Sequence, residues 1–382
     1  MKKAAAILIC AIFGLTAAAC ARVYKADDTV FDSELQFSVR MYGGDTEKAY
    51  EEMLALMDRL SASADTTDPD SVISRVNAAP VGAAVEVDEI FCELTAAATE
   101  LYRETDGAFN VFLRPLSVLW GVDAESVRDY VPTAANPAGS SPASLPGTAE
   151  IEPLLASARP ESFGLTGHES GGTLIKTAAV EFDFGGLAKG WAVDRCREIA
   201  EKYDIQSAQL DLSGNLVLLN RYYDEKSGAF TDWTVGITDP RPEDLLFRYY
   251  VMAFRSAGDV SIVTSGDYER YYYYSYENRN PVRVAHIIGK DGVPVGLRRD
   301  ADGTYSNAEH VISATVVGES SMLADAYATA VCVMGLTDGA AFLEEKGYAG
   351  VIFTSDGRMK IVGSITPYGG ETFDGYLGYE QV

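Results

Sequence analysis

A carboxylate and a hydroxyl, those of Asp325 and Thr329, stand four residues apart toward the C-terminal end of the chain. Asp325 and Thr329 lie in the segment Ser321–Met334, where apolar residues recur at helical spacing. Residues four apart share a helix face, so the carboxylate and the hydroxyl would be neighbours. Both are hard oxygen ligands that suit Mg²⁺ or Ca²⁺. A helix without a metal explains the same pattern, with Asp325 favouring the first turn and Thr329 bonding back to a carbonyl.

A glycine pair separates an apolar segment from a helical pattern in the stretch Glu181–Asp194. Gly185 and Gly186 allow the backbone to approach a ligand closely. The helix that follows would present free N–H groups and a partial positive charge at its first turn, and Lys189 adds a full charge. These features suit a phosphate, although the segment lacks the spacing of a Walker A loop. A plain strand-to-helix turn with an exposed lysine explains the same residues about equally well.

Two further turns carry polar residues that could contact a ligand. Thr105–Asn110 contains an Asp-Gly turn whose backbone could bond the edge of a heterocycle, or which simply ends a helix. In Val263–Arg270 an apolar strand ends in small polar residues, and Gly266 permits a close backbone approach. Asp267 and Arg270 stand three positions apart and could form an ion pair with no part in function.

The composition limits the kinds of ligand and partner. The 382 residues include 56 acidic and 31 basic side chains, which gives a formal net charge of −25. Neither nucleic acid nor an anionic membrane surface is therefore an expected partner. The three histidines and five cysteines show no CxxC or HExxH spacing. A zinc site is not expected, and a bound metal should be a hard cation held by oxygen.

Residues 1–19 have the pattern of an export signal. Lys2 and Lys3 precede an apolar run, and small residues stand directly before Cys20. This arrangement is typical of a lipoprotein signal peptide with Cys20 as the lipidated residue, and Ala-x-Ala cleavage without lipidation is the alternative. The run is too short and wrongly flanked for an ordinary membrane-spanning helix. We expect an exported protein, lipid-anchored to the cell membrane and facing the periplasm or the cell exterior, with residues 20–29 as a tether.

Periodicity in the rest of the chain indicates a mixture of strands and helices. Strands are expected at Val30–Met41, Ala179–Phe184, Ala208–Leu219, Trp233–Ile237, Tyr249–Phe254 and Ile262–Thr264, and helices at Thr46–Leu60, Ile90–Thr105, Leu187–Tyr203 and Ser321–Met334. Because the order lacks a clean β-α-β alternation, we predict an α+β fold with a mixed or antiparallel sheet and packed helices, in one compact domain over residues 30–365. The Pro-, Ala-, Ser- and Gly-rich stretch 132–147 is expected to be a mobile insertion, and 366–382 a C-terminal tail.

Taken in order, these segments resemble the ApbE-type FAD:protein FMN transferases, a family of exported flavin-transfer enzymes. Six blocks carry the resemblance: Ser71–Asn77, Asp106–Gly121, Asp183–Asp194, Trp233–Pro240, Thr264–Arg270 and Ala324–Gly335. The family's Asp-x-Gly-x-x-Ala-Lys-Gly-x-x-x-Asp motif, for example, stands at Asp183–Asp194. Asn110 stands where the family usually has an aspartate.

The resemblance implies a substrate, a metal and a set of site residues. Enzymes of this family bind FAD with a divalent metal at its pyrophosphate, usually Mg²⁺, for which Ca²⁺ or Mn²⁺ could substitute. The metal ligands implied here are the Gly186 carbonyl and the side chains of Asp325 and Thr329. The implied FAD contacts are Ala108, Phe109 and Asn110 at the adenine end, with Asp183, Lys189 and, at the flavin end, His286. FMN would pass to a threonine hydroxyl of an exported acceptor protein, and AMP would leave.

The sequence departs from the family pattern on the side expected to hold the flavin. The N-terminal Met-Gly/Asp-Thr motif appears as Phe31-Asp32-Ser33, and an aromatic residue usual before the Ser-Arg-Asn block aligns near Ser63. The family's His-Ile-x-Asp-Pro-x-Thr-Gly appears as His286–Gly292, without the Asp-Pro and the Thr, and its Gly-Gly-Asn-Ile turn as Ser213–Leu216. His286 could hold the flavin end, assist proton removal as a catalytic residue, or be a structural histidine.

Four functions follow from these observations. The first is transfer of FMN from FAD to an acceptor protein. The second is Mg²⁺-dependent hydrolysis of FAD to FMN and AMP, with water as the nucleophile. The third is a lipoprotein that binds FAD without turnover, and the fourth is a purely structural role. The altered flavin side favours the last two, whereas the intact metal and phosphate motifs favour chemistry at the pyrophosphate.

Overall fold

A computed structural model describes residues 23–31, 35–123, 142, 144–168, 170–241, 250–276, 280–365, 367–368 and 379–382. The expected signal peptide, the lipidated Cys20, and most of the insertion and of the C-terminal tail lie outside these ranges. Within them, none of the helices is both long and apolar enough to cross a bilayer.

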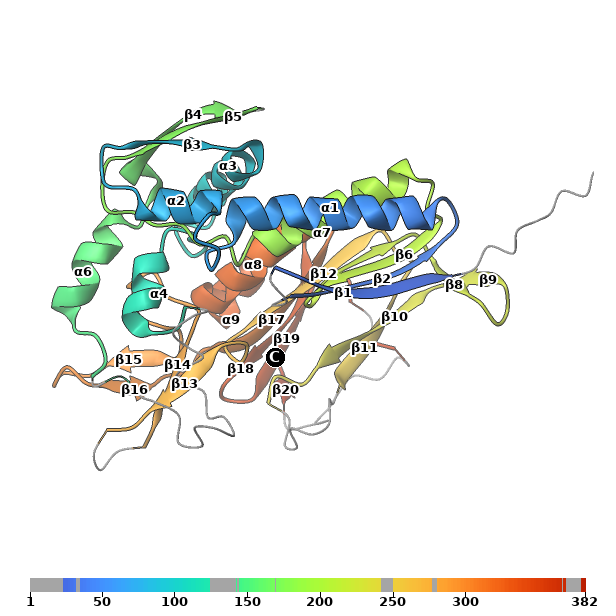
Figure 1. The fold of residues 1–382 in the computed structure, drawn as a ribbon. Coiled ribbons are helices and arrows are strands. Elements are labelled where there is room, and N and C mark those ends of the chain that lie inside the picture. Colours follow the sequence, from blue (N-terminus) through green and yellow to red (C-terminus); the bar gives the residue numbers. More distant parts are fainter. Residues whose placement is uncertain are drawn as a thin grey trace, which may run out of the picture.

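A nine-stranded sheet forms the centre of the described structure (Figure 1). Its order is β1-β2-β6-β7-β12-β17-β18-β19-β20, and neighbouring strands are antiparallel except β19 and β20. The strands are β1 Tyr24–Val30, β2 Leu35–Tyr42, β6 Ser207–Leu212, β7 Asn215–Leu219, β12 Val260–Gly266, β17 Val311–Gly318, β18 Ala349–Thr354, β19 Arg358–Val362 and β20 Glu380–Gln381.

Both faces of the sheet are covered, because successive side chains of a strand point to opposite faces. Val217, Val263 and Ile352 belong to a core shared with helices α1 (Thr46–Ala64), α7 (Ala188–Lys202) and α8 (Ser321–Met334). Their chain neighbours Leu218, Ile262 and Val351 belong to a second core, closed by the hairpin β10 (Trp233–Thr238) and β11 (Tyr250–Ser256). The helices and the hairpin therefore hold the sheet between two apolar layers.

Smaller elements complete the fold. A three-stranded sheet of β3 (Ala84–Val87), β5 (Gly171–Lys176) and β4 (Phe163–His168) lies with α2 (Val72–Ala78) and α3 (Glu89–Glu104) at one end of the molecule (Figure 1). A third apolar cluster joins α4 (Arg114–Trp120) and α6 (Thr148–Ser157) to the hairpin of β13 (Tyr271–Tyr274) and β14 (Val282–Ala285). The remaining elements are β8 Tyr222–Asp224, β9 Ala229–Thr231, β15 Leu297–Arg299, β16 Tyr305–Asn307, the short 3₁₀ helix Pro160–Ser162 and α9 Leu336–Lys346.

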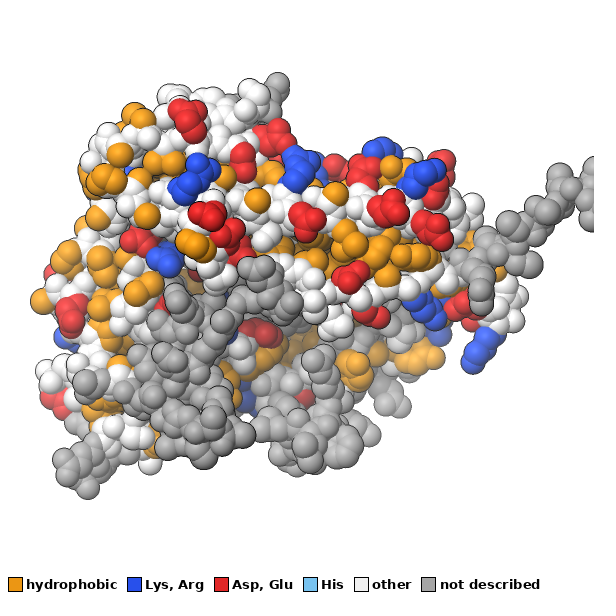
Figure 2. Space-filling model, in the orientation of Figure 1, with side chains coloured by type: hydrophobic (Ala, Val, Ile, Leu, Met, Phe, Trp, Pro, Cys, Tyr) orange, Lys and Arg blue, Asp and Glu red, His pale blue; other side chains and the backbone are white. Residues whose placement is uncertain are grey.

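The solvent-exposed face of α1 carries many of the charged side chains that are visible in Figure 2. Acidic and basic side chains are interspersed along this helix (Figure 2), among them Glu47, Lys48, Asp58 and Arg59. The opposite face carries the apolar residues at helical spacing that pack into the core, such as Met53 and Leu60. Side chains of both signs are typical of a solvated helix face.

The α+β prediction is confirmed, and several element boundaries are corrected. The expected strand Val30–Met41 is two strands, β1 and β2, and Ala208–Leu219 is the hairpin of β6 and β7. Ala179–Phe184 is not a strand: among the described residues only Glu181 forms a ladder bridge there, with Leu113. Strand β1 begins at Tyr24, within the stretch 20–29 expected to be a tether, and β20, within the expected tail, pairs with β19.

Candidate functional site

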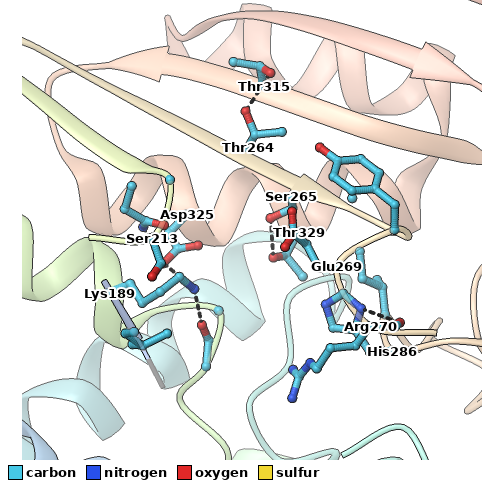
Figure 3. Close-up of a pocket in the computed structure, with 18 of the residues that line it drawn as sticks. Lys189, Ser213, Thr264, Ser265, Glu269, Arg270, His286, Thr315, Asp325 and Thr329 are labelled. Carbon is cyan, nitrogen blue, oxygen red and sulfur yellow. Dashed lines mark hydrogen bonds and ion pairs between the residues drawn. The ribbon is translucent and has the colours of Figure 1, made fainter. Parts of the chain in front are cut away.

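One cavity of about 2000 Å³ brings the predicted site residues together. Its wall contains all of them: Ala108, Phe109, Asn110, Asp183, Gly186, Lys189, His286, Asp325 and Thr329. In Figure 3, Lys189 and Asp325 lie on one side, Ser265 and Thr329 lie in the middle, and Glu269, Arg270 and His286 lie on the other side. The sequence segments that carry these residues are far apart, so the fold assembles the site.

The segment before α7 is held extended by a side chain and not by a strand. The Asn77 amide donates to the Phe182 carbonyl over 2.9 Å, and the Phe182 N–H donates to Asn77 Oδ1 over 2.7 Å. Next to it, the Asp183 N–H donates to the Val111 carbonyl, and Asp183 Oδ1 accepts from the Gly185 N–H over 2.8 Å. These bonds deliver the glycine pair to the cavity wall. A Cβ on Gly186 would lie 3.4 Å from Thr329 Oγ1, so glycine lets this backbone approach the Thr329 hydroxyl closely.

Asp325 is buried in the cavity wall, with 3% of its surface exposed. Its Oδ2 accepts from the Gly190 N–H at 3.1 Å and from Asn215 Nδ2 at 2.9 Å, and the Lys189 ammonium lies 3.9 Å away. Lys189 also donates to the Gly185 carbonyl over 2.8 Å. No donor among the described residues contacts Asp325 Oδ1 in the structure. One carboxylate oxygen is therefore oriented by the protein, and the other remains for a ligand.

Gly190 permits the close crossing of α7 and α8 that places Lys189 beside Asp325. A Cβ at position 190 would lie 2.4 Å from the Ser321 carbonyl oxygen. This distance is too short for any side chain, so only glycine fits there. Asp194, one turn further along α7, accepts from the Ser320 hydroxyl at 2.7 Å and from the N–H groups of Ser321 and Met322 at 2.8 and 3.0 Å. This carboxylate caps the first turn of α8 and joins the two helices that carry the site.

Thr329 lies one helical turn from Asp325 and faces the end of β12. Its hydroxyl forms a hydrogen bond of 3.1 Å with the Ser265 hydroxyl. That contact replaces the bond back to a helix carbonyl that was the alternative interpretation of Thr329. Ser265 and Asn215 lie in segments that the sequence marked, but their role in orienting Thr329 and Asp325 is visible only in the fold.

The donor set suits a hard cation. Asp325, Thr329 and the Gly186 carbonyl offer one carboxylate, one hydroxyl and one backbone oxygen, which are ligands that Mg²⁺ and Ca²⁺ use. Among the described residues, no three His, Cys, Asp or Glu side chains lie close enough together to hold a metal. The remaining coordination positions of a cation at Asp325 could be filled by water or by substrate phosphates, both of which Mg²⁺ commonly uses.

His286 lies on the other side of the cavity and is fixed by the backbone of Arg270. The His286 N–H donates to the Arg270 carbonyl over 3.1 Å, and Nδ1 lies 3.2 Å from the same oxygen. Since a carbonyl can only accept, the proton belongs on Nδ1, and Nε2 is an acceptor. Burial, followed by the charge of Arg270, lowers the pKa of His286 to about 3, and the charge of Lys189 acts in the same direction. The imidazole is therefore neutral at ordinary pH.

Asp267 does not pair with Arg270, contrary to the simplest interpretation of their spacing. Its fully buried carboxylate accepts two bonds of 2.6 Å from Arg241 and one of 2.9 Å from His310, and Arg283 Nε lies 3.6 Å away. Burial raises the pKa of Asp267, but the bonds from His310 and Arg241 outweigh it and hold the pKa below its usual value. This cluster ties the segments after β10 and β12 to β14, and Arg241 and Arg283 also line the cavity.

The segment at the expected adenine end is shaped by its own side chains. Thr105 Oγ1 accepts from the Phe109 N–H at 3.0 Å, and Asn110 Oδ1 accepts from the Phe112 N–H at 2.8 Å. Asn110 Nδ2 also donates to the Ala158 carbonyl over 2.9 Å. Because the Asn110 side chain is used within the protein and the Phe109 ring is buried in the core, this segment would offer a ligand mainly its backbone groups.

The motifs that depart from the family pattern do not all lie at the cavity wall. Ser63 is buried in α1, where its hydroxyl donates to Asp88 Oδ1 over 2.8 Å, and it does not line the cavity. The wall there is formed by residues 64–67, together with Phe31 from the end of β1. In the changed stretch Gly289–Gly292, Lys290 pairs with Asp106. That ion pair joins the stretch to the turn before the adenine-end segment.

The chain is similar to known proteins over most of its length. The model of the ApbE family matches residues 31–353. The FAD:protein FMN transferase of Treponema pallidum is 27% identical over 354 residues, which span 89% of this chain and 87% of the relative. The FAD:protein FMN transferase of Vibrio cholerae is 28% identical over 304 residues, which span 78% and 77%.

Solved structures share the fold. The crystal structure of the ApbE protein from Thermotoga maritima aligns with a TM-score of 0.67 at 26% identity, over 89% of this chain and 97% of that one. The apo form of the flavinyl transferase ApbE from Pseudomonas stutzeri aligns with a TM-score of 0.66 at 24% identity, over 90% and 94%. The α+β architecture described above is therefore the architecture of these proteins.

Proposed function

The chain belongs to the ApbE family, and we propose that it is an FAD:protein FMN transferase that moves FMN from FAD to a threonine hydroxyl of an exported acceptor protein. The observation that carries this proposal is the cavity itself. A buried carboxylate and a lysine at a helix start lie on one side, and a neutral histidine lies on the other. A pyrophosphate between them would meet cationic groups, and a hydroxyl on the histidine side would meet a proton acceptor.

Each residue has a distinct task in this proposal. Asp325, Thr329 and the Gly186 carbonyl would hold a divalent cation, preferably Mg²⁺. That cation, when bound, neutralises charge on the pyrophosphate and on the leaving AMP. Lys189 adds a fixed positive charge at the start of α7, where helix N–H groups also favour anions. Ala108, Phe109, Asn110 and Asp183 line the part of the cavity proposed for the rest of FAD.

The chemistry is an exchange of one phosphoester bond for another. The threonine oxygen bonds to the phosphorus of the FMN half, the bond from that phosphorus to the AMP oxygen breaks, and AMP leaves. The hydroxyl proton passes to a base, for which Nε2 of His286 is the acceptor on this side of the cavity. The low pKa of His286 keeps it unprotonated beforehand, and the negative charge of bound FAD would raise that pKa toward the useful range.

The size of the cavity supports transfer over mere binding. Pockets for single small ligands have volumes of roughly 300–1,000 Å³, and this cavity has about 2000 Å³. Space therefore remains for a segment of an acceptor protein beside FAD. Closing water out of that space is what would separate transfer from hydrolysis.

Chromatography of FAD incubated with the protein, Mg²⁺ and a candidate acceptor tests this proposal. Transfer gives AMP and flavin bound covalently to the acceptor. Hydrolysis gives AMP and free FMN, and a binding protein leaves FAD unaltered. The variant Asp325→Ala is the matched control, since it removes the one buried carboxylate proposed as a metal ligand.

The N-terminal features complete the proposal. Residues 1–19 would direct export, and a lipid on Cys20 would anchor the enzyme to the outer side of the cell membrane, where an exported acceptor is accessible. Metabolic labelling with a fatty acid tests this: the protein should carry the label, and Cys20→Ser should not.

A further inference from the structure

We propose that Arg270 is a catalytic residue whose guanidinium binds the phosphate group being transferred and stabilises its negative charge during the attack. The inference rests on the proposed function and adds to it a cation on the flavin side of the cavity. Four other basic residues also line the cavity, and their ion pairs can be compared with the surroundings of Arg270: Arg114, Lys189, Arg241 and Arg283.

Those four residues each have an acidic partner. Arg114 lies 2.7 Å from Glu181, Lys189 lies 3.9 Å from Asp325, and Arg241 and Arg283 share Asp267 at 2.6 and 3.6 Å. Arg270 differs, because within the part of the chain that the structure describes its guanidinium has neither a carboxylate within 4 Å nor a hydrogen bond. Glu269, the residue directly before it, also lines the cavity but forms no ion pair with it, and Asp267 is already bonded by other partners.

The backbone of Arg270 is nevertheless held firmly. Its carbonyl accepts the His286 N–H at 3.1 Å and faces His286 Nδ1 at 3.2 Å. The next residue, Tyr271, is the first of β13 and pairs with Ala285 of β14. Arg270 and His286 therefore form one rigid unit opposite Lys189 and Asp325, with Ser265 and Thr329 between them (Figure 3).

The charge arrangement indicates an anionic ligand. A partly buried cation without a partner is costly, whereas a guanidinium facing a phosphate forms paired, charge-assisted bonds in its planar geometry. Because His286 is neutral, Arg270 carries the positive charge on this side, where Glu269 also lines the wall without forming an ion pair with it.

The position of Arg270 selects which phosphate it would meet. Lys189 and Asp325 lie toward the other side, with Thr329 between, so a pyrophosphate that spans the cavity would have one phosphate nearer to Lys189 and the other nearer to Arg270. Arg270 would contact the FMN phosphate, on which the threonine oxygen forms its bond as the bond to the AMP oxygen breaks. The gain is largest where charge develops, so the effect should appear in the rate as well as in binding.

Three variants test the inference: Arg270→Gln, Arg270→Lys and the control Arg298→Gln. Arg298 is exposed on β15, lies 3.8 Å from Asp300 and does not line the cavity. Calorimetry would measure the affinities for FMN and for AMP separately, and circular dichroism would check folding. In Arg270→Gln the FMN affinity should fall roughly 10- to 100-fold, as expected for losing charged hydrogen bonds, while the AMP affinity stays within about twofold. Arg270→Lys should lie between, and Arg298→Gln should equal the wild type.

Turnover gives the second measurement. AMP release by Arg270→Gln at saturating FAD should also be slower by roughly 10-fold or more, because the charge on the transferred phosphate loses a partner. Equal affinity of the wild type and Arg270→Gln for FMN, or equal losses for FMN and AMP, would overturn the role of Arg270 while leaving the transferase proposal intact. A wild type that binds neither FMN nor FAD would overturn both.

Discussion

The side-chain amide of Asn215 donates to Asp325 Oδ2 over 2.9 Å, although the two residues are 110 positions apart in sequence. Asn215 begins β7 and is buried, and Asp325 lies in the first half of α8. The bond fixes the plane of the carboxylate, with Oδ2 turned to the protein. Support of this kind tunes a metal ligand without touching the metal.

Asn215→Ala should weaken the cation site and spare the fold. We expect the Mg²⁺ concentration for half-maximal activity to rise roughly 10- to 100-fold, as for other residues that orient metal ligands. A Mg²⁺ titration of AMP release measures it. Asp325→Ala should be inactive at any Mg²⁺ concentration, and excess EDTA should silence the wild type. Full activity of Asp325→Ala, or of the wild type in EDTA, would exclude the proposed metal site.

Lys189 should contribute mainly electrostatic attraction for FAD. Its ammonium lies 3.9 Å from Asp325 and 2.8 Å from the Gly185 carbonyl, at the start of α7. Lys189→Gln should weaken FAD binding, and the difference from the wild type should shrink as salt is added, because salt screens charge interactions. Calorimetry at low and high ionic strength checks this. An unchanged affinity would make Lys189 a residue of the wall with no part in binding.

Asp194 should act on the site through the position of α8. Its carboxylate accepts bonds from Ser320, Ser321 and Met322 at 2.7, 2.8 and 3.0 Å. Asp194→Ala should reduce the free energy of unfolding by about 1–3 kcal/mol, the range for a lost cap with partly buried donors. Denaturant unfolding measures this loss. Asp194→Asn, which keeps an acceptor oxygen, should recover part of it, and failure of that rescue would contradict the capping role.

The free energy of unfolding should depend on pH because His286 is buried in its neutral form. Its pKa is lowered from 6.5 to about 3 in the folded protein, so between these values the unfolded chain binds the extra proton. Stability should therefore be complete above about pH 6.5 and fall as the pH drops toward 3. Urea unfolding across this range measures the slope, and His286→Gln should flatten it. The pKa of Asp267 is lowered in the folded protein from its ordinary value of 3.8. The stabilisation that its ionised carboxylate provides should therefore be lost only as the pH falls below 3.8.

Local pattern was enough to predict part of the site. The apolar spacing of Ser321–Met334 predicted α8 with its observed bounds, and that helix places Asp325 and Thr329 one turn apart. The glycine pair before α7 likewise predicted a helix start with Lys189 in its first turn. These are short-range properties, because helical periodicity and turn chemistry act over a few residues.

Long-range partners could not be predicted in this way. Alternating Val180, Phe182 and Phe184 favoured a strand, but the partner of Phe182 is the Asn77 side chain, 105 residues away. The spacing of Asp267 and Arg270 allowed an ion pair, yet the fold brings Arg241, Arg283 and His310 to Asp267 instead. A single sequence holds no signal for such pairings, because they depend on the order of strands in the sheet.

Mass spectrometry of an acceptor protein, after incubation with this enzyme, FAD and Mg²⁺, tests the central claim most directly. We predict an acceptor carrying FMN on a threonine, with one AMP released for each flavin attached and neither product formed by Asp325→Ala. Free FMN and AMP in equal amounts, with every tested acceptor unmodified, would contradict transfer and identify the protein as an FAD hydrolase.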